Sequence, residues 1–290
     1  MKTAIVTDTN SGITAEQGRM HGVYVLPMPV IIDGKSYLEG VDITNSQLYE
    51  ALSQDRSVSS SQPSPGDVMA LWDQVLSEGF DELVYIPMSS SLSGSCQSAA
   101  LFAKDYDSRV QVVDNRRISV TLMESAWDAK HLADQGLSAR EIKSYLEETS
   151  CQASIHISVD SLKYLKKSGR ITPTAAAIAN ILNIKPVLTI QGGKLDLIAK
   201  ARGNRQSEKK MIEALRADLS GRFCNIPKNR LHLATAGTFE HREDAERWLH
   251  TVEAAFPEYP VYYMPLSCSI ACHVGINAAG IGVTVTADRT

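Results

Sequence analysis

The sequence lacks a continuous apolar run of about 18 residues, the length that a membrane-crossing helix needs. The apolar run after Lys2 is too short for a signal peptide, so we expect a cytoplasmic protein with at most transient membrane contact. A surplus of basic residues is also lacking. The chain has 29 Lys and Arg against 33 Asp and Glu, a net charge of −4, which argues against a broad nucleic-acid-binding surface.

Cysteine is scarce and scattered. The five cysteines are an odd number with no regular spacing, so a disulfide framework is not expected. Cys268 and Cys272 lie four residues apart and His273 follows, but no second cluster supplies the further ligands that a metal site requires. We interpret the two cysteines as small residues that pack a helix, and expect no metal.

Motifs for nucleotide binding and hydrolysis are incomplete. Gly275 and Gly280 have the glycine spacing of a phosphate-binding loop, but Ile281 and Gly282 stand where Lys and Ser or Thr are needed. Ser93 lies in Ser-Leu-Ser-Gly-Ser rather than in the G-x-S-x-G turn of α/β-hydrolases. We therefore expect no nucleotide site and no cofactor, and keep a triad of Ser93, His273 and Asp8 only as an alternative.

The order of elements predicts an α/β protein with two domains. Strands over 3–7, 82–88 and 109–114 alternate with helices, which is typical of a parallel sheet and defines a domain over 1–150. A proline-containing ribbon with an Asp33-Gly34 turn predicts a small β-subdomain over about 23–41. Residues 151–290 form a second, mixed α/β domain, with an alanine-rich helix predicted over 173–182.

Two serine-rich loops carry most of the candidate site residues. Ser89–Ala99 joins a buried strand to a helix, at the sheet edge where α/β proteins bind ligands. Its hydroxyls, a glycine and free N–H groups at the helix start can surround an anion, although a solvated loop with a helix cap fits equally well. In the second loop, Ser57–Asp67, Pro63 keeps the preceding serines extended so that their hydroxyls project.

Basic residues gather in two short segments of the second half. They suggest either an anionic partner or an ordinary solvated face. The residues are Lys163, Lys166, Lys167, Arg170, Arg202 and Arg205.

Motifs spread over the whole chain resemble the DegV family of fatty-acid-binding proteins, the binding subunits of bacterial fatty acid kinase. The matching segments are Thr7-Asp8-Thr9, Ser60-Ser-Gln-Pro63, Ser89-x-x-Leu-Ser-Gly94 with Gln97-Ser98, Ser161 to Ile171, Lys185-Pro-Val-Leu188 and His273-x-Gly275. The chain departs from the family pattern in having Ser60 for threonine, Ser168 for glycine, and Val274, Ile276 and Asn277 after the histidine.

The resemblance implies a lipid tunnel between two α/β domains and a long-chain fatty acid as ligand. It further implies that the chain is not itself an enzyme and that a partner ATP-dependent kinase phosphorylates the bound carboxylate. The implied carboxylate-binding residues are Ser60, Ser61, Ser93, Gly94, His273 and Gly275. Lys167, Arg170 and Arg202 would then face the kinase.

Three hypotheses follow for the site. In the first, uncharged donors rather than an arginine hold the carboxylate, and residues 175–182 line an apolar tunnel. In the second, the protein is a serine esterase that acts on lipids through Ser93 and His273. In the third, it is a sugar- or triose-binding module, which predicts a polar cleft instead of an apolar tunnel.

Overall fold

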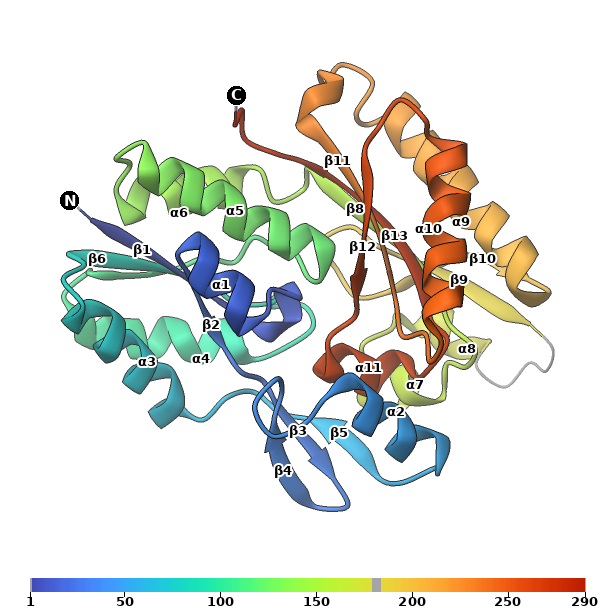
Figure 1. Cartoon of the computed structure of the whole chain (residues 1–290), viewed down its shortest axis with the longest axis horizontal. Helices are drawn as coiled ribbons and strands as arrows, with labels where there is room; N and C mark the ends of the chain where they lie inside the picture. Colours follow the sequence, from blue (N-terminus) through green and yellow to red (C-terminus); the bar gives the residue numbers. More distant parts are fainter. Residues whose placement is uncertain (1, 179–183, 290) are drawn as a thin grey trace.

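The computed structural model describes residues 2–178 and 184–289. Its chain runs through an N-terminal half and a C-terminal half that lie side by side, with a small sheet below them (Figure 1). The predicted helix over 173–182 begins as expected with α8 (Pro173–Ala177), capped by the Thr172 side chain. The rest of that prediction, from 179 onward, lies outside the described residues.

The N-terminal sheet is parallel throughout, as the alternating pattern predicts. Its order is β2 (Val23–Leu26), β1 (Thr3–Asp8), β6 (Glu82–Ile86) and β7 (Val110–Val112). Every residue of β1 is buried, because helices cover both faces of the sheet. α3 (Pro65–Ser77) and α4 (Ser95–Phe102) pack on one face; α5 (Val120–Asp134) and α6 (Ala139–Glu148) pack on the other. α1 (Ala15–His21) precedes β2.

The small β-subdomain differs from its predicted bounds. Val23–Leu26 pairs with β1 and so belongs to the parallel sheet, which the chain leaves at Pro27. The small sheet starts at β3 (Pro29–Ile32), which pairs with β4 (Lys35–Leu38) and, on its other side, with β5 (Val58–Ser60). The prediction of 23–41 was therefore wrong at both ends. Its start falls on a strand of the parallel sheet, and its end misses the partner strand β5, which comes from a distant part of the chain. α2 (Asn45–Ser53) packs against this sheet.

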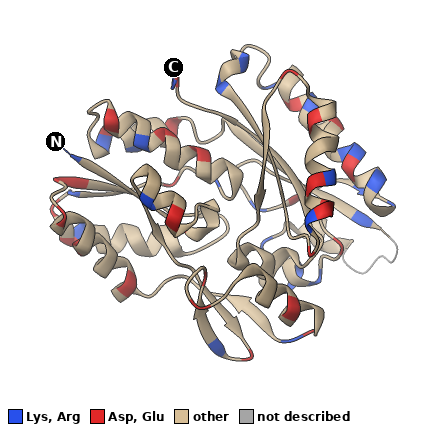
Figure 2. Ribbon diagram, viewed as in Figure 1, with Lys and Arg blue, Asp and Glu red and all other residues tan. Residues whose placement is uncertain are grey.

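The C-terminal sheet is mixed and has six strands. Their order is β10 (Asp196–Ala201), β9 (Lys185–Ile190), β8 (Ala153–Ser158), β13 (Ala279–Val285), β11 (Leu231–Gly237) and β12 (Val261–Pro265). Only β11 and β12 among these pairs are parallel. α9 (Gly203–Ser220) and α10 (Arg242–Ala255) cover one face, where Trp248 is fully buried. Figure 2 shows Lys and Arg interspersed with Asp and Glu along these two helices.

The other face of the C-terminal sheet turns toward the N-terminal half. α5 packs against β1 and also against β13, β11 and β8, so it lies between the two sheets. The apolar cluster there combines Leu92, Ile118 and Val120 from the first half with Ile155 and Ile157 from β8. The described strands of the first two sheets end by Val112 and those of the third begin at Ala153. The boundary near residue 150 stays a prediction.

Two short helices complete the region around this cluster. α7 (Lys163–Ser168) ends at Gly169, whose left-handed conformation reverses the chain. α11 (Cys268–Val274) packs against β5, β3 and α2, where Cys268 and Cys272 enter the apolar cluster of the β-subdomain. Cys268 and Cys272 are buried free thiols, which agrees with their interpretation as packing residues.

Candidate functional site: a cavity between the two halves

A cavity opens between the facing sides of the two halves. The atom-free space between its walls is ≈ 900 Å³, open solvent at the mouth included. Most of the wall is apolar. Its apolar side chains are Met28, Met88, Leu92, Ile118, Val120, Ile155, Ile157, Leu165, Ile190, Leu195, Ala236, Leu266, Ile270, Val274 and Ile281.

The wall differs in part from the predicted one. Ala175 and Ile178 belong to the surrounding apolar cluster but are not among the lining residues, and 179–182 lie outside the described part of the chain. The wall comes instead from β8, β9, α11 and the start of α5. Strand alternation explains the contribution of β8, since Ile155 and Ile157 point to the cavity while His156 points to α9.

The polar end of the cavity is formed where β5 meets α11. The Ser60 Oγ and the His273 Nε2 lie 2.9 Å apart, and both side chains line the cavity together with Ser61. Cys272 holds the two elements together by donating its Sγ proton to the Ser59 carbonyl at 3.5 Å. Two of the predicted serines and the predicted histidine are therefore brought to one place.

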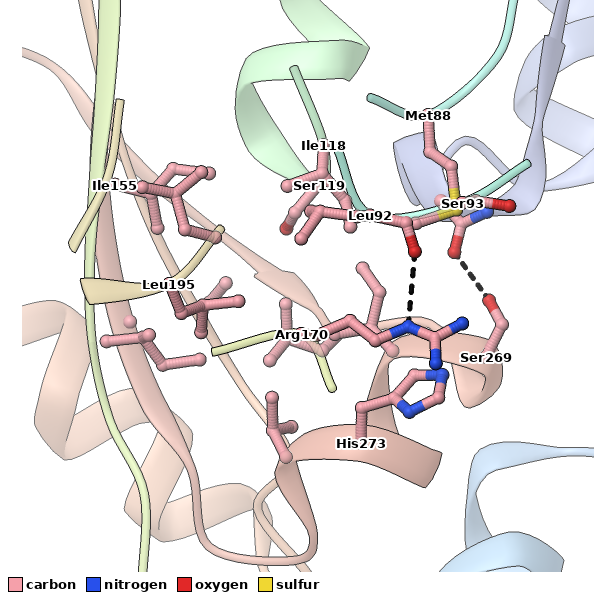
Figure 3. A pocket seen from close by; sticks show the side chains of 18 of the residues that line it. Met88, Leu92, Ser93, Ile118, Ser119, Ile155, Arg170, Leu195, Ser269 and His273 are labelled. Atoms are coloured by element: carbon pink, nitrogen blue, oxygen red, sulfur yellow. Dashed lines mark hydrogen bonds between the residues drawn. The ribbon is translucent and has the colours of Figure 1, made fainter. Parts of the chain in front are cut away.

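Arg170 also lines this end, which the sequence interpretation did not foresee. The turn at Gly169 carries the side chain inward, where its Nε donates to the Leu92 carbonyl at 3.2 Å (Figure 3). Its guanidinium lies beside His273. Burial, and then the charge of Arg170, lower the pKa of His273 to about 4, so the imidazole is neutral at physiological pH. The expectation that only uncharged donors stand here was wrong, since a guanidinium is present.

Ser93 and Gly94 lie where the cavity meets a shallower depression outside it. Ser93 lines both, and its Oγ shares a hydrogen bond of 2.8 Å with the Ser95 Oγ. Gly94 lines only the outer depression, which Arg170 borders as well. The Ser93 hydroxyl is therefore not paired with His273, as a catalytic triad would require.

The remaining predicted residues lie outside the cavity wall. Gly275 ends α11 with φ of 76°, and its carbonyl accepts a 2.7 Å hydrogen bond from the Thr238 Oγ1. It fixes the turn after His273 and does not face the cavity. Lys167 on α7 and Arg202 at the start of α9 are exposed, and neither lines the cavity.

A buried polar network beneath the polar end escaped the sequence analysis. The Ser269 Oγ donates to the Asn10 Oδ1 at 2.7 Å, and the Glu39 Oε2 lies 3.1 Å away as an alternative acceptor for the same proton. Both Ser269 and Asn10 line the cavity. Asp8 accepts from the Asn10 backbone N–H at 2.9 Å, so it caps its own turn. Burial raises the pKa of Asp8 to about 6. No local signal marks Ser269, because its partners lie far away in the sequence.

Ser119 is a further lining residue that the sequence interpretation missed. It stands immediately before α5 with φ of 56° and ψ of −136°, a backbone conformation that favours glycine. Its side chain is buried, and its Oγ has no hydrogen-bond partner among the described residues. Strain at a cavity wall is a signal that only the structure reveals.

Residues 2–178 and 184–289 contain neither a candidate metal cluster nor a candidate membrane span. No group of three or more His, Cys, Asp or Glu side chains is placed to hold a metal ion. Among the same residues, no helix combines the length and the apolar character needed to cross a membrane.

This fold and cavity define an α/β protein with an apolar ligand site between two sheets. The family model described as "Uncharacterised protein, DegV family" matches residues 2–286. A DegV domain-containing protein of Caldanaerobacter subterraneus subsp. tengcongensis is 32% identical over 285 residues, which cover 97% of this chain and 98% of that protein. The chain belongs to the DegV family, and the resemblance inferred from its motifs is confirmed.

Solved structures of similar proteins agree with this assignment. A fatty-acid-binding DegV family protein from Thermus thermophilus has a TM-score of 0.86 and 27% identity, covering 98% of this chain and all of its own. A stearic-acid-binding protein from Eubacterium ventriosum has a TM-score of 0.86 and 25% identity, covering 98% of both chains. The predicted fold class, two α/β domains with a parallel and a mixed sheet, is confirmed.

Proposed function

We propose that this protein binds a long-chain fatty acid, with the acyl chain in the apolar cavity and the carboxylate at the polar end. The observation that carries the proposal is the cavity itself, whose apolar wall leads to Ser60, His273 and Arg170 at one end. Structural neighbours that are fatty-acid-binding DegV proteins support it.

The energetics agree with such a ligand. Burial of about 14 methylenes at about 0.8 kcal/mol each contributes roughly 11 kcal/mol. Association costs of about 4 kcal/mol or more leave an affinity in the micromolar range. The carboxylate needs replacements for its hydration, and the Ser60 hydroxyl, the His273 ring and the Arg170 guanidinium are the donors available.

Neutral His273 suits this role. Its Nε2 shares a hydrogen bond with the Ser60 Oγ, so both groups are oriented. A carboxylate that binds beside them adds a negative charge, which raises the pKa of His273 and so opposes the lowering of that pKa by Arg170. The bound acid can therefore be held by donors from two separate parts of the chain.

The test is native mass spectrometry of the protein purified from a bacterium, before and after lipid extraction. We expect one fatty acid per chain, lost on extraction and restored by added stearic acid. A purified protein without lipid that also fails to take up stearic acid from solution would contradict the proposal. Gas chromatography of the extract identifies the acyl chain.

We further propose that the bound carboxylate is presented to a partner ATP-dependent kinase in the cytoplasm. The carboxylate oxygen would attack the γ-phosphorus of ATP, giving an acyl phosphate and ADP. One feature supports presentation to a partner. Ser93 and Arg170 border both the cavity and the outer depression, so a carboxylate at the polar end would lie next to an accessible surface. The exposed Lys167 and Arg202 are the candidates for kinase contact. Hydroxylamine trapping of acyl phosphate, with and without this protein, tests the step.

The alternatives fit the geometry less well. An esterase needs a serine paired with a histidine that a carboxylate orients, whereas His273 has a guanidinium beside it and the Ser93 Oγ is paired with Ser95. Because His273 has a guanidinium beside it where a triad needs a carboxylate, we expect a fluorophosphonate probe to label neither Ser93 nor Ser60, the serine that contacts His273. A sugar or triose would leave the large apolar wall without a matching ligand surface.

A further inference from the structure

Ser119 on the cavity wall lacks a hydrogen-bond partner for its side chain among the described residues, whereas three other serines of the wall have one. The Ser60 Oγ is bonded to His273, the Ser93 Oγ to Ser95 and the Ser269 Oγ to Asn10. Ser119 is 4% exposed, and its Oγ makes no hydrogen bond to any described residue. An unpaired buried hydroxyl is destabilising, and on a cavity wall a ligand group can supply the missing partner.

The backbone of Ser119 adds a second cost at the same position. With φ of 56° and ψ of −136°, the residue occupies a region where glycine is the ordinary choice. The conformation is held by a 2.9 Å hydrogen bond from the Ser119 N–H to the Asn10 carbonyl. Glycine would relieve the strain and remove the unpaired hydroxyl together, and serine does neither.

The surroundings of Ser119 indicate which group it could bind. It precedes the 15-residue helix α5 without capping it through its side chain, so the positive end of the helix dipole faces the same place. Leu92 and Ile118 line the wall beside it (Figure 3). Val120, the next residue along the chain, lines the cavity as well. This setting suits a neutral oxygen with free lone pairs. The negatively charged carboxylate of the ligand is better stabilised beside the Arg170 guanidinium.

We propose that Ser119, with the start of α5, binds an oxygen substituent on the acyl chain, so that the ligands of this protein include hydroxy fatty acids. The proposal rests on the proposed fatty-acid function and goes beyond it by naming a subclass of ligand. A chain hydroxyl at this point gives Ser119 the partner it lacks, while the carboxylate keeps its donors at Ser60, His273 and Arg170.

The test compares stearic acid with hydroxystearic acids that carry the hydroxyl at successive carbons. Binding constants are measured by isothermal titration calorimetry on the delipidated full-length protein. We expect one positional isomer to bind at least about fivefold more tightly than the isomers next to it. Equal affinity of all isomers would overturn the proposal.

Two variants separate the hydroxyl from the backbone strain. Ser119→Ala removes the hydroxyl and keeps the strain, and Ser119→Gly removes both and is compatible with the fold. Both should lose the preference for that isomer and keep the affinity for stearic acid. A preference retained in both variants, or an equal loss of stearic acid, would show that Ser119 does not select a chain hydroxyl.

The same titrations keep the two proposals apart. If stearic acid binds but no hydroxy isomer is preferred, only the role of Ser119 fails. If neither stearic acid nor any hydroxystearic acid binds the delipidated protein, the fatty-acid function fails and this inference fails with it.

Discussion

Ser60 and His273 are 213 positions apart in the sequence, yet the serine Oγ and the histidine Nε2 lie 2.9 Å from one another. The serine ends a strand of the small β-subdomain, and the histidine lies on α11 of the C-terminal half. The polar end of the cavity thus depends on the packing of these two parts. Substitutions of Ser60 or His273 therefore test ligand binding and the packing of these two parts together.

Replacing Ser60 with alanine should weaken fatty-acid binding about three- to tenfold, because one donor to the carboxylate is lost. It should cost about 1 kcal/mol of stability, since the His273 Nε2 loses its partner. Calorimetric titration with stearic acid and urea unfolding measure the two effects. Ser59→Ala is the matched control, because Ser59 is the exposed neighbour on the same strand. Equal losses in both variants would contradict a direct role for Ser60.

The pH dependence of stability should report His273. Its pKa is lowered from 6.5 to about 4, mainly by burial and then by Arg170. Between these values the unfolded chain binds a proton that the native protein does not, so stability is lost as the pH falls through this window. The loss should reach at most about 3 kcal/mol relative to a His273→Gln variant, measured by urea unfolding from pH 7 to pH 4.

Asp8 titrates in the same window with the opposite sign. Its pKa is raised to about 6, again mainly by burial, so the native protein holds a proton more readily and stability falls as the pH rises from about 4 to about 6. The difference between wild type and His273→Gln at each pH removes this contribution, because both contain Asp8. A pH-independent difference would show that His273 is not buried in its neutral form.

Arg170 should contribute to ligand affinity rather than only to partner contact. Arg170→Gln removes the guanidinium from the polar end, and we expect stearic acid to bind about tenfold more weakly because a charge-assisted contact is worth about 1.5 kcal/mol. Lys167→Gln is the control, since it removes a positive charge three positions away on an exposed side chain. Unchanged affinity of the Arg170→Gln variant for stearic acid would indicate that Arg170 does not bind the carboxylate and would favour the partner contact expected from the sequence.

How much of the structure can be predicted from the sequence depends on how far apart in the chain the interacting residues lie. Thr44, Ser64 and Ser138 cap their helices, and such caps are readily predicted from a sequence because each depends on a residue three positions away. The family motifs also placed Ser60 and His273 at one site. The pairing of β5 with β3 and the inward turn of Arg170 could not be predicted, because each depends on segments distant in the sequence.

Lys167 and Arg202 provide the test of the kinase partner. If they contact the kinase, Lys167→Glu and Arg202→Glu should lower acyl phosphate formation about tenfold or more, through like-charge repulsion at the interface, and leave stearic acid affinity unchanged. The assay uses a bacterial fatty acid kinase with ATP, and hydroxylamine traps the product. Lys200→Glu, an exposed change on β10, is the control. Normal rates in both variants at physiological salt would indicate a solvated face.

Gly280 offers a way to narrow the cavity without disturbing the fold. It lines the cavity from β13, and a Cβ added there would meet nothing closer than 3.7 Å. Gly280→Ala should therefore raise stability by about 0.5 kcal/mol, because glycine weakens a strand interior. The larger Gly280→Val should fill space that the acyl chain needs, and stearic acid should bind at least tenfold more weakly.

This prediction separates binding from folding, since Gly280→Ala should raise the stability and Gly280→Val should lower the affinity for stearic acid. Urea unfolding gives the stability, and calorimetric titration with stearic acid gives the affinity. Gly193→Ala, where an added Cβ has no atom within 4 Å, should change neither. If Gly280→Val binds stearic acid as tightly as wild type, the acyl chain does not pass β13, and the cavity between the two sheets is not where it lies.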